Sequence, residues 1–356
     1  MKNLKKLKGF SLIEIMIAIV ISAILLLGAT GMFISNKRIY REQNAIGRLQ
    51  ENARFAMEML IKDIRRAGYL GCADDPSQVN NNLAPIGVTD LLNFSNPVEG
   101  SEAAGNWQPS TSTEITGSIL PIGNMQTRPD GITVRFLAPI QTNQIKFTTA
   151  QVVSGTNPIP VTCPGADCTS NPTVVTNDDI ALSDCAATDI FRLSGVTATT
   201  LTHAPNLSRT FDDKSQLSFY TATRYYIGQG GNDNAGNPIP SLFRYTYTPA
   251  SGLTSQLLIE GVENMQLLYG VDNNADTIAD SYVDAANVAG AGGWANVVSV
   301  RIGLLMRTIN PDFSQDKDTR AYALLGTSIY TAGSPPNDNF RRRVFSTTVQ
   351  IRNRGQ

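Results

Sequence analysis

The feature that most constrains this chain is an apolar stretch close to its start. Phe10–Ile34 contains one charged side chain, Glu14, and no proline. About 20 apolar residues are enough for a helix to cross the hydrocarbon core of a bilayer, so the stretch predicts a transmembrane helix. A secretory signal would have a shorter apolar region and a small-residue cleavage site behind it, and none follows here. We therefore expect the span to be retained.

Basic residues precede this span and predict its orientation. Residues 1–9 contain four lysines and no acid: Lys2, Lys5, Lys6 and Lys8. Because positive residues stay on the cytoplasmic side, we expect a single pass through the inner membrane, with a cytoplasmic N-terminus and a periplasmic C-terminal domain. The net charge of −1 gives no overall field that would attract nucleic acid, and we predict no nucleic-acid partner.

Glu14 is a carboxylate inside the predicted span. Placing such a group at the centre of a membrane helix costs about 2.5–3.5 kcal/mol on insertion scales. An ionisable residue there indicates a functional site with a cationic partner. The alternative is that Glu14, which lies near one end of the span, reaches the cytoplasmic headgroups.

The helix pattern continues beyond the span. Residues 36–67 have apolar side chains at spacings of three and four, which predict a helix with one buried face. The members of this stripe are Ile46, Leu49, Ala53, Ala56, Leu60, Ile64 and Ala67. We expect one continuous helix with a transmembrane half at 10–34 and an amphipathic half at 35–68, ended by Gly68.

The remainder, residues 69–356, is predicted to be a β-rich domain with long loops. Residues 73–131 suggest loops with a few short strands, and strand-like patterns follow from Ile132 onward. The expected strands are Ile132–Ala138, Gln144–Val153, Ile190–Leu193, Leu217–Ile227, Leu242–Thr248, Val262–Tyr269, Val297–Arg307, Ala321–Tyr330 and Arg343–Arg352. The predicted fold class is α+β, with a long N-terminal helix packed on a mainly antiparallel sheet.

All four cysteines lie beyond the predicted membrane span, in a compartment that favours disulfides. Three pairings are possible in principle. Cys163 and Cys168 enclose a short loop, and pairing them leaves Cys72 with Cys185. A metal site is the alternative, but the chain has one histidine and no Cys-x-x-Cys pair.

One loop has oxygen-bearing side chains at alternating positions, as at the start of a Ca²⁺ loop. The candidate ligands are Asp272, Asn274, Asp276, the Ile278 carbonyl and Asp280. The pattern departs from a Ca²⁺ loop at Thr277, where glycine is expected, and at Val283, where a closing Glu is expected. A solvated turn is therefore the competing interpretation, and we predict no other cofactor.

No catalytic motif is present, and we predict that the chain is not an enzyme. There is no Gly-x-Ser-x-Gly, Walker A or nicotinamide-binding glycine pattern. His203, the only histidine, stands in a polar stretch with no recognisable triad partners and is expected in an exposed loop. Arg341–Arg343 is expected to be a solvated cluster that protects a strand edge, rather than a nucleic-acid or partner patch.

The N-terminal motif resembles a known signal. Lys8-Gly9-Phe10-Ser11-Leu12-Ile13-Glu14 is similar to the type III signal of type IV pilins: a basic leader, Gly, Phe, and an acid four residues after the Phe. Most of the remaining chain resembles PilW-type minor pilins. The segments that carry this resemblance are Asp63–Tyr69 with Gly71-Cys72, Gly261–Met265, Val297–Arg307 and Arg341–Val349.

The resemblance implies a processing and assembly sequence. A prepilin peptidase would remove the leader, residues 1–9, by cutting between Gly9 and Phe10, and would methylate the new Phe10 amine. Glu14 would then pair with the Phe10 amine of a neighbouring subunit in a filament. The implied partners are prepilin peptidase, other minor pilins, the major pilin, the inner-membrane assembly platform and the lipid bilayer.

These inferences predict a minor pilin that takes part in initiating or assembling a type IV pilus. A large pseudopilin of a type II secretion system is the alternative within the same kind of machinery. A membrane-tethered periplasmic enzyme or receptor is a third reading, but it leaves Gly9 and Glu14 without a role. The absence of a catalytic cluster also counts against it.

Overall fold

The computed structural model describes most of the chain. The described residues are 11–73, 78–83, 91, 94, 96–102, 124–140, 145–155, 157–163, 167–169, 174–204, 206–248, 252–314 and 316–354. The predicted leader, Gly9 and Phe10 lie outside them.

One long helix, α1, spans Leu12–Arg66. It ends where the sequence predicts, because Arg65 and Arg66 occupy its last turn and Gly68 has φ +72°, a conformation that favours glycine. The chain divides into two compact units between Arg48 and Leu49, so the first part of α1 and the remainder are described separately.

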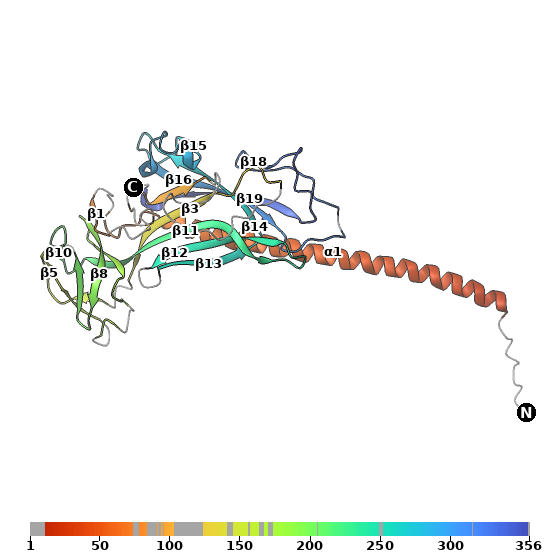
Figure 1. Cartoon of the computed structure of the whole chain (residues 1–356), viewed down its shortest axis with the longest axis horizontal. Helices are drawn as coiled ribbons and strands as arrows, with labels where there is room; N and C mark the ends of the chain where they lie inside the picture. The colour runs from red at the N-terminus through yellow and green to blue at the C-terminus, as the bar shows by residue number, and fades with distance from the viewer. Residues whose placement is uncertain are drawn as a thin grey trace, which may run out of the picture. The chain divides into compact units, whose positions relative to one another are not determined.

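The second unit contains two main sheets (Figure 1). The first, which we call the β11 sheet, has the order β13-β12-β11-β7-β8-β9-β6-β4, with β3 also on β11, β2 on β3 and β1 on β8. Its strands are β1 (Val79–Asn81), β2 (Val98–Ser101), β3 (Gly131–Pro139), β4 (Lys146–Phe147), β6 (Ile159–Thr162), β7 (Asp179–Ser183), β8 (Thr188–Val196), β9 (Thr200–Ala204), β11 (Gln216–Asn232), β12 (Pro238–Thr248) and β13 (Gly252–Glu260).

The second, the β14 sheet, has the order β15-β14-β16-β19. Its strands are β14 (Val262–Val271), β15 (Ser281–Val283), β16 (Val297–Arg307) and β19 (Arg342–Gln350). Two further pairs are β5 (Gln151–Val152) with β10 (Phe211–Asp212) and β17 (Tyr322–Leu324) with β18 (Thr327–Tyr330). Short helices η3, η4 and η5 span Ala285–Asn287, Trp294–Asn296 and Arg352–Arg354. Apart from the parallel pair β1–β8, the strand pairs are antiparallel, so the predicted α+β fold is confirmed.

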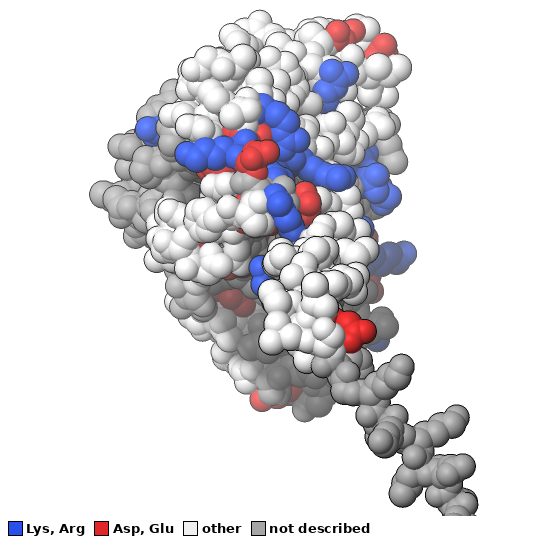
Figure 2. Space-filling model, turned by 90° about the vertical axis from the view of Figure 1, so that its right-hand side faces the viewer, with Lys and Arg blue, Asp and Glu red and all other residues white. Residues whose placement is uncertain are grey.

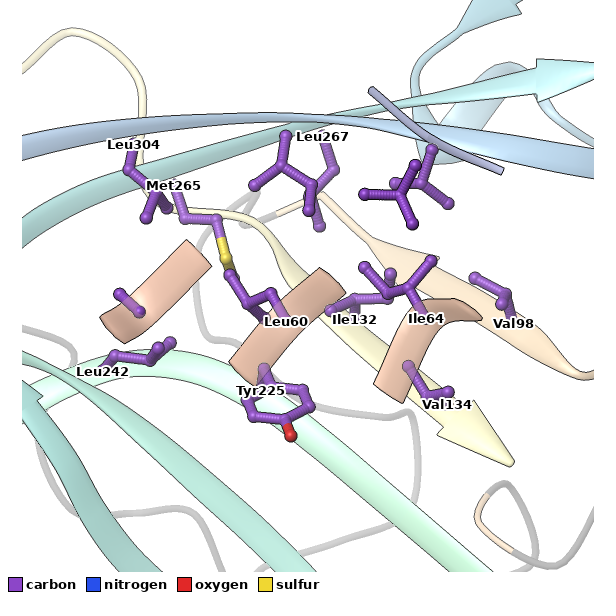
Figure 3. Close-up of a cluster of buried hydrophobic side chains, with 14 of the residues drawn as sticks. Leu60, Ile64, Val98, Ile132, Val134, Tyr225, Leu242, Met265, Leu267 and Leu304 are labelled. Atoms are coloured by element: carbon purple, nitrogen blue, oxygen red, sulfur yellow. The ribbon is translucent and has the colours of Figure 1, made fainter. Parts of the chain in front are cut away.

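The core of the second unit forms where α1 lies between the two sheets (Figure 3). Leu60 and Ile64 are completely buried, as is the rest of the predicted stripe from Leu49 onward. On one side they meet Met265 and Leu267 of β14, and on the other Tyr225 of β11. Burying a Leu or Ile side chain contributes about 1.5–3 kcal/mol, so this stripe fixes the helix between the sheets.

The opposite face of the β11 sheet is organised by a buried arginine on β3. Arg135 has a fully buried side chain, as expected for a residue whose neighbours in the strand face α1. It donates hydrogen bonds to the carbonyls of Leu91 (3.1 Å) and Asn96 (2.5 Å) and to the Glu99 carboxylate (2.8 Å). The guanidinium therefore ties Leu91, Asn96 and Glu99 to the back of the sheet.

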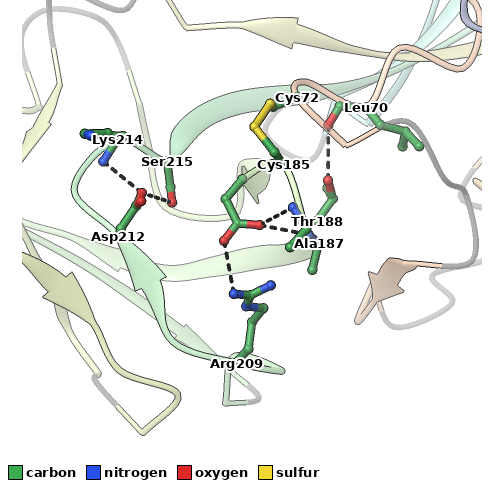
Figure 4. The surroundings of a disulfide bond; sticks show 11 residues. Leu70, Cys72, Cys185, Ala187, Thr188, Arg209, Asp212, Lys214 and Ser215 are labelled. Carbon is green, nitrogen blue, oxygen red and sulfur yellow. Dashed lines mark hydrogen bonds and ion pairs between the residues drawn. A yellow bond between two sulfur atoms is a disulfide. The ribbon is translucent and has the colours of Figure 1, made fainter.

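Two disulfides join distant and local parts of this unit. Cys72, just after the helix, is bonded to Cys185 in the β7–β8 turn, with a Cα–Cα distance of 4.5 Å (Figure 4). Beside it, Thr188 Oγ1 donates to the Leu70 carbonyl (3.1 Å). Cys163 is bonded to Cys168 across a separation of five residues. Because Cys72–Cys185 closes a loop of 113 residues, it restricts the unfolded chain more than the short loop does.

Two predicted strands are wrong in detail. The predicted strand Ala321–Tyr330 is instead the hairpin β17–β18, which turns at Leu325 (φ +51°) and Gly326 (φ +96°). Gly326 suits such a turn, but Leu is a rare residue at a turn position with positive φ, so the sequence signal for the turn was weak. Within the predicted strand Gln144–Val153, the described residues form two short strands, β4 and β5, separated by bends.

The prediction for His203 is also wrong. His203 lies on β9 and is 1% exposed, and its ring packs 4.8 Å from the Phe191 ring. Its backbone N–H and C=O both bond to the Asn157 side chain. The sequence Thr200–Ala204 is short and polar, but Leu201 and His203 share its buried face, which is the two-residue period of a strand.

A buried acid joins β3 to the β14 sheet. Asp130, 3% exposed, precedes β3 and donates its N–H to the Met265 carbonyl (2.7 Å), while its carboxylate accepts the Leu267 N–H (2.8 Å). Burial, followed by the nearby charge of Glu102, raises the pKa of Asp130 to about 8, and Asp284 adds to the effect. Asp130 is therefore protonated at neutral pH.

We predict that this acid makes stability depend on pH. Since the pKa of Asp130 is raised on folding, the native state binds an extra proton between about pH 4 and pH 8, and the free energy of unfolding falls as pH rises through that range. Asp130→Asn should reduce this fall by at least about 2 kcal/mol, because one pKa unit corresponds to about 1.4 kcal/mol. Denaturant unfolding at a series of pH values measures it. The exposed control Asp213→Asn should keep the wild-type slope, and an unchanged slope in Asp130→Asn would contradict the assignment.

Candidate functional site

The first unit begins with a capped helix end. The Ser11 N–H donates to Glu14 Oε2 (3.0 Å), and the Ile15 N–H donates to the Ser11 carbonyl (3.2 Å). This is half of a capping box, in which an acid at the third helical position satisfies a free N–H at the helix start. The carboxylate also lies at the positive end of the helix dipole. Glu14 is thus held at the helix start.

The surface around Glu14 is apolar and uncovered. Every side chain from Ser11 to Arg41 is exposed. Among the residues that the structure describes, α1 is the one helix long and apolar enough to cross a membrane, with a mean hydropathy of 2.7 over the relevant window. Ser22 and Thr30 donate their hydroxyls to the Ala18 and Leu26 carbonyls (2.7 and 2.9 Å). These bonds satisfy the hydroxyls within the helix, as a lipid environment requires.

Glu14 differs from these hydroxyls because its hydrogen bonding is incomplete. An ionised carboxylate has about four acceptor positions, and the Ser11 N–H is its donor within the described chain. A charged group left in lipid with one donor is costly. The geometry therefore leaves room for a cation from outside this helix.

The predicted Ca²⁺ residues lie in the loop between β14 and β15. Asp272 is the centre of this loop: its Oδ1 accepts the N–H groups of Asn274 (3.1 Å) and Ala275 (2.8 Å), and its Oδ2 accepts that of Thr277 (2.7 Å). Ala275 and Thr277 have positive φ, 62° and 69°. Burial raises the pKa of Asp272, but these backbone donors outweigh burial, and the net pKa is lower than usual.

The other predicted ligands gather around the same turn. The Asn274 side-chain amide is 3.2 Å from Asp276 Oδ2 and 3.3 Å from Asp280 Oδ1, and Asp280 Oδ2 accepts the Asn273 N–H (2.7 Å). Ile278 donates its N–H to Asp276 Oδ1 (2.8 Å), and its side chain is exposed. Across the described residues, no three His, Cys, Asp or Glu side chains are arranged to hold a metal ion. Cation binding here would need Asn274 and backbone carbonyls as additional ligands.

Ca²⁺ binding to this loop is directly testable. If the loop binds the ion, adding Ca²⁺ to chelator-treated protein should raise the melting temperature by at least about 4 °C at a hundredfold excess over Kd, because binding stabilises the native state by about 2.7 kcal/mol. Asp276→Asn should remove the shift. Asp233→Asn is the matched control, since Asp233 also accepts two backbone N–H groups in a tight loop. Equal melting temperatures with and without Ca²⁺ would assign the loop to a solvated turn.

Two sequence segments that are far apart meet in a buried ion pair. Glu263 of β14 and Arg342 of β19 are both buried, and their carboxylate and guanidinium groups are joined by two hydrogen bonds of 2.6 and 2.8 Å. Arg342 also binds Asp338 twice, at 2.6 Å each. Tyr330 donates its hydroxyl to Glu263 (3.1 Å). The expectation that Arg341–Arg343 is wholly solvated is therefore wrong for Arg342.

This network was missed because its members are separated by 79 residues in the sequence. Glu263 and Arg342 each lie in a segment with a strand pattern. The sequence shows only that a charged residue stands at a position expected to be buried, and it does not show which residue is its partner. Arg307 is at the edge of the network, 3.9 Å from Glu263. The network connects β14, β16 and β19 to the segment that carries Tyr330 and Asp338.

Glu263→Gln should be strongly destabilising. Glu263→Gln removes one of the carboxylates that Arg342 binds, which leaves this buried guanidinium with Asp338 and only partly compensated. Breaking a buried ion pair costs about 3–5 kcal/mol. Chemical denaturation measures this loss in the free energy of unfolding. Glu51→Gln, at an exposed position of α1, should stay within about 0.5 kcal/mol of wild type. A loss below 1 kcal/mol for Glu263→Gln would show that the network contributes little.

Comparison with known proteins covers both ends of this chain. The protein-family model described as the prokaryotic N-terminal methylation motif matches residues 4–30, which include Glu14. The model described as Type IV Pilus-assembly protein W matches residues 224–353, which include the Asp272–Asp280 loop and the Glu263–Arg342 pair. No curated protein matches the chain. A methylation motif at the start of one apolar helix, together with a PilW match on the β domain, supports a type IV pilin-like protein of the PilW type.

Proposed function

We propose that this protein is a minor pilin, a structural subunit that joins other pilins at the start of or within a type IV pilus. The observation that carries the proposal is the Glu14 carboxylate, which lies on an uncovered apolar helix with one backbone donor. A carboxylate in that setting calls for a cation from another molecule. Its role is recognition between subunits, and no catalysis is assigned to it.

The proposed cation is the amine of Phe10. Hydrolysis of the Gly9–Phe10 peptide bond by prepilin peptidase consumes one water and frees that amine, which a methyl donor then methylates. The methylated amine keeps its positive charge. On a neighbouring subunit it would meet Glu14 among apolar helices, where an unpaired charge is costly, so pairing favours one axial offset between adjacent helices.

The orientation follows from the flanking residues. Lys2, Lys5, Lys6 and Lys8 would hold residues 1–9 in the cytoplasm. The second unit would then fold in the periplasm, an oxidising compartment in which the disulfides Cys72–Cys185 and Cys163–Cys168 can form. After assembly, the apolar part of α1 would leave the bilayer for the helix bundle of the filament. The partners are then prepilin peptidase, the assembly platform, the major pilin and other minor pilins.

Processing provides the main test. In cells with active prepilin peptidase, the mature protein should begin at N-methyl-Phe10, as determined by mass spectrometry of the N-terminal peptide. A mature protein that still begins at Met1 would contradict the proposal.

Glu14→Ala separates processing from assembly. Cleavage after Gly9 should continue, because the bond itself is unchanged. Incorporation into sheared pili should fall at least about tenfold, since loss of one partner from a buried ion pair costs more than 1.4 kcal/mol. Immunoblotting of sheared pili measures this fall. Glu51→Ala, at an exposed position beyond the apolar segment, should be incorporated normally. Normal incorporation of Glu14→Ala would remove the pairing role.

A further inference from the structure

The last strand of the chain lies at the edge of a sheet. β19 follows β16 at the end of the β14 sheet, and its nine residues pair with β16 without a register shift, from Ser299↔Gln350 to Arg307↔Arg342. No other described strand pairs with β19. One long side of β19 is therefore open.

The register shows which backbone groups face that open side. At one end of the pair the Thr308 N–H donates to the Arg341 carbonyl, and at the other the Ile351 N–H donates to the Val298 carbonyl, both at 2.9 Å. In an antiparallel pair, hydrogen-bonded and non-hydrogen-bonded positions alternate. The odd-numbered residues of β19 thus bond to β16. The even-numbered residues therefore point their N–H and C=O groups outward; after Arg342, which is buried, these are Val344, Ser346, Thr348 and Gln350.

This open side is accessible. Val344, Ser346, Thr348 and Gln350 are exposed, Val344 by 44%. Besides charged side chains, which β19 has at Arg343, proteins blunt an open edge with short length, a bulge or proline. At the other end of this sheet β15 has three residues, and β13 at the end of the β11 sheet has a register shift against β12. β19 has none of these three devices.

The charged residues of β19 and of the segment that follows it are all basic. No acid occurs in residues 339–356. Arg343 and Arg352 are exposed, and neither forms an ion pair with any described residue. Figure 2 shows a face of the molecule on which Lys and Arg side chains gather with a few acids among them. A second copy of β19 would bring Arg343 of one chain toward Arg352 of the other, so an acid-bearing strand fits better.

We propose that the open edge of β19 pairs with an extended, acid-bearing strand of another pilin-like subunit, which continues the β14 sheet into that subunit. The backbone groups at 344, 346, 348 and 350 supply the hydrogen bonds, as in strand addition to an exposed edge. Arg343 and Arg352 favour acids on the partner. This inference rests on the proposed function, which supplies neighbouring subunits, and adds a recognition surface on the β domain.

Proline substitution tests whether the open edge of β19 pairs with a partner strand, and it can do so without removing a side-chain contact to β16. Ser346→Pro removes an outward N–H, and proline is tolerated on the open side of an edge strand. Its melting temperature should stay within about 2 °C of wild type. Thr347→Pro removes an inward N–H and should lower the melting temperature clearly. Ser346→Ala keeps the N–H and is the matched control for the side chain.

Amide hydrogen exchange is the readout. The full-length protein in detergent micelles is mixed with each purified pilin-like subunit of the same pilus in turn. One of them should slow exchange at 344, 346, 348 and 350 by at least about tenfold in wild type and Ser346→Ala. In Ser346→Pro, which has no amide hydrogen at 346, it should fail to slow exchange at 344, 348 and 350. Reversing the charge in Arg343→Glu should weaken this protection.

Three results would overturn the inference. The first is that no subunit protects these amides, and the second is that Ser346→Pro is protected as well as wild type. The third is that raising the concentration of this protein alone protects them, which would assign the edge to a second copy. The N-terminal test is independent of this one. A protein that is cleaved at Phe10 and assembled but has a free β19 edge contradicts only the strand pairing. A protein that is not cleaved contradicts the proposed function.

Discussion

The second unit depends on one packing constraint: a single helix face must be buried against two sheets at once. Leu49, Leu60 and Ile64 are large enough to fill the space between β11 and β14, while Ala53 and Ala56 let the strands approach the helix axis. Without this stripe, both sheets would expose the apolar faces that meet the helix. The same helix continues as a segment whose apolar side chains are all exposed, so its two parts require different surroundings, one of protein and one of lipid or neighbouring helices.

The periodicity of the sequence was sufficient to predict the elements with a clean pattern. Helix α1 and strand β16, Val297–Arg307, have the predicted bounds or nearly so. The first part of α1 is continuously apolar, its second part has an apolar stripe at helical spacing, and β16 is apolar over most of its length. The prediction failed where the deciding interaction was not local. The β17–β18 hairpin turns at Leu325, whose positive φ is imposed by the strands around it. His203 is buried by Phe191, a neighbour across the β8–β9 pair that no short stretch of sequence could indicate.

The candidate sites differ in the same way. Glu14 could be singled out from the sequence because a lone carboxylate in an apolar helix is costly and indicates a functional site; its pairing remains a prediction. The Asp272–Asp280 loop was predictable because its residues are consecutive, and the structure adds the backbone turns that gather its side chains. The Glu263–Arg342 pair was not, because a charge in a strand pattern does not name its partner. Removing the two charges of such a pair from water costs free energy. In this protein the pair connects parts of the fold, because it holds three strands and the segment before β19 in one arrangement.

That arrangement links the interior of the β domain to its recognition surface. Arg342 and Arg343 are neighbours in the chain, yet Arg342 is buried against Glu263 and Arg343 is exposed. The ion pair fixes the start of β19, and the register with β16 then determines which N–H and C=O groups face outward along the whole strand. A slip of one residue would turn Val344 and Ser346 toward β16 and leave Phe345 and Thr347 outside. The buried charge therefore specifies the edge that we assign to a partner, although neither of its members would touch that partner.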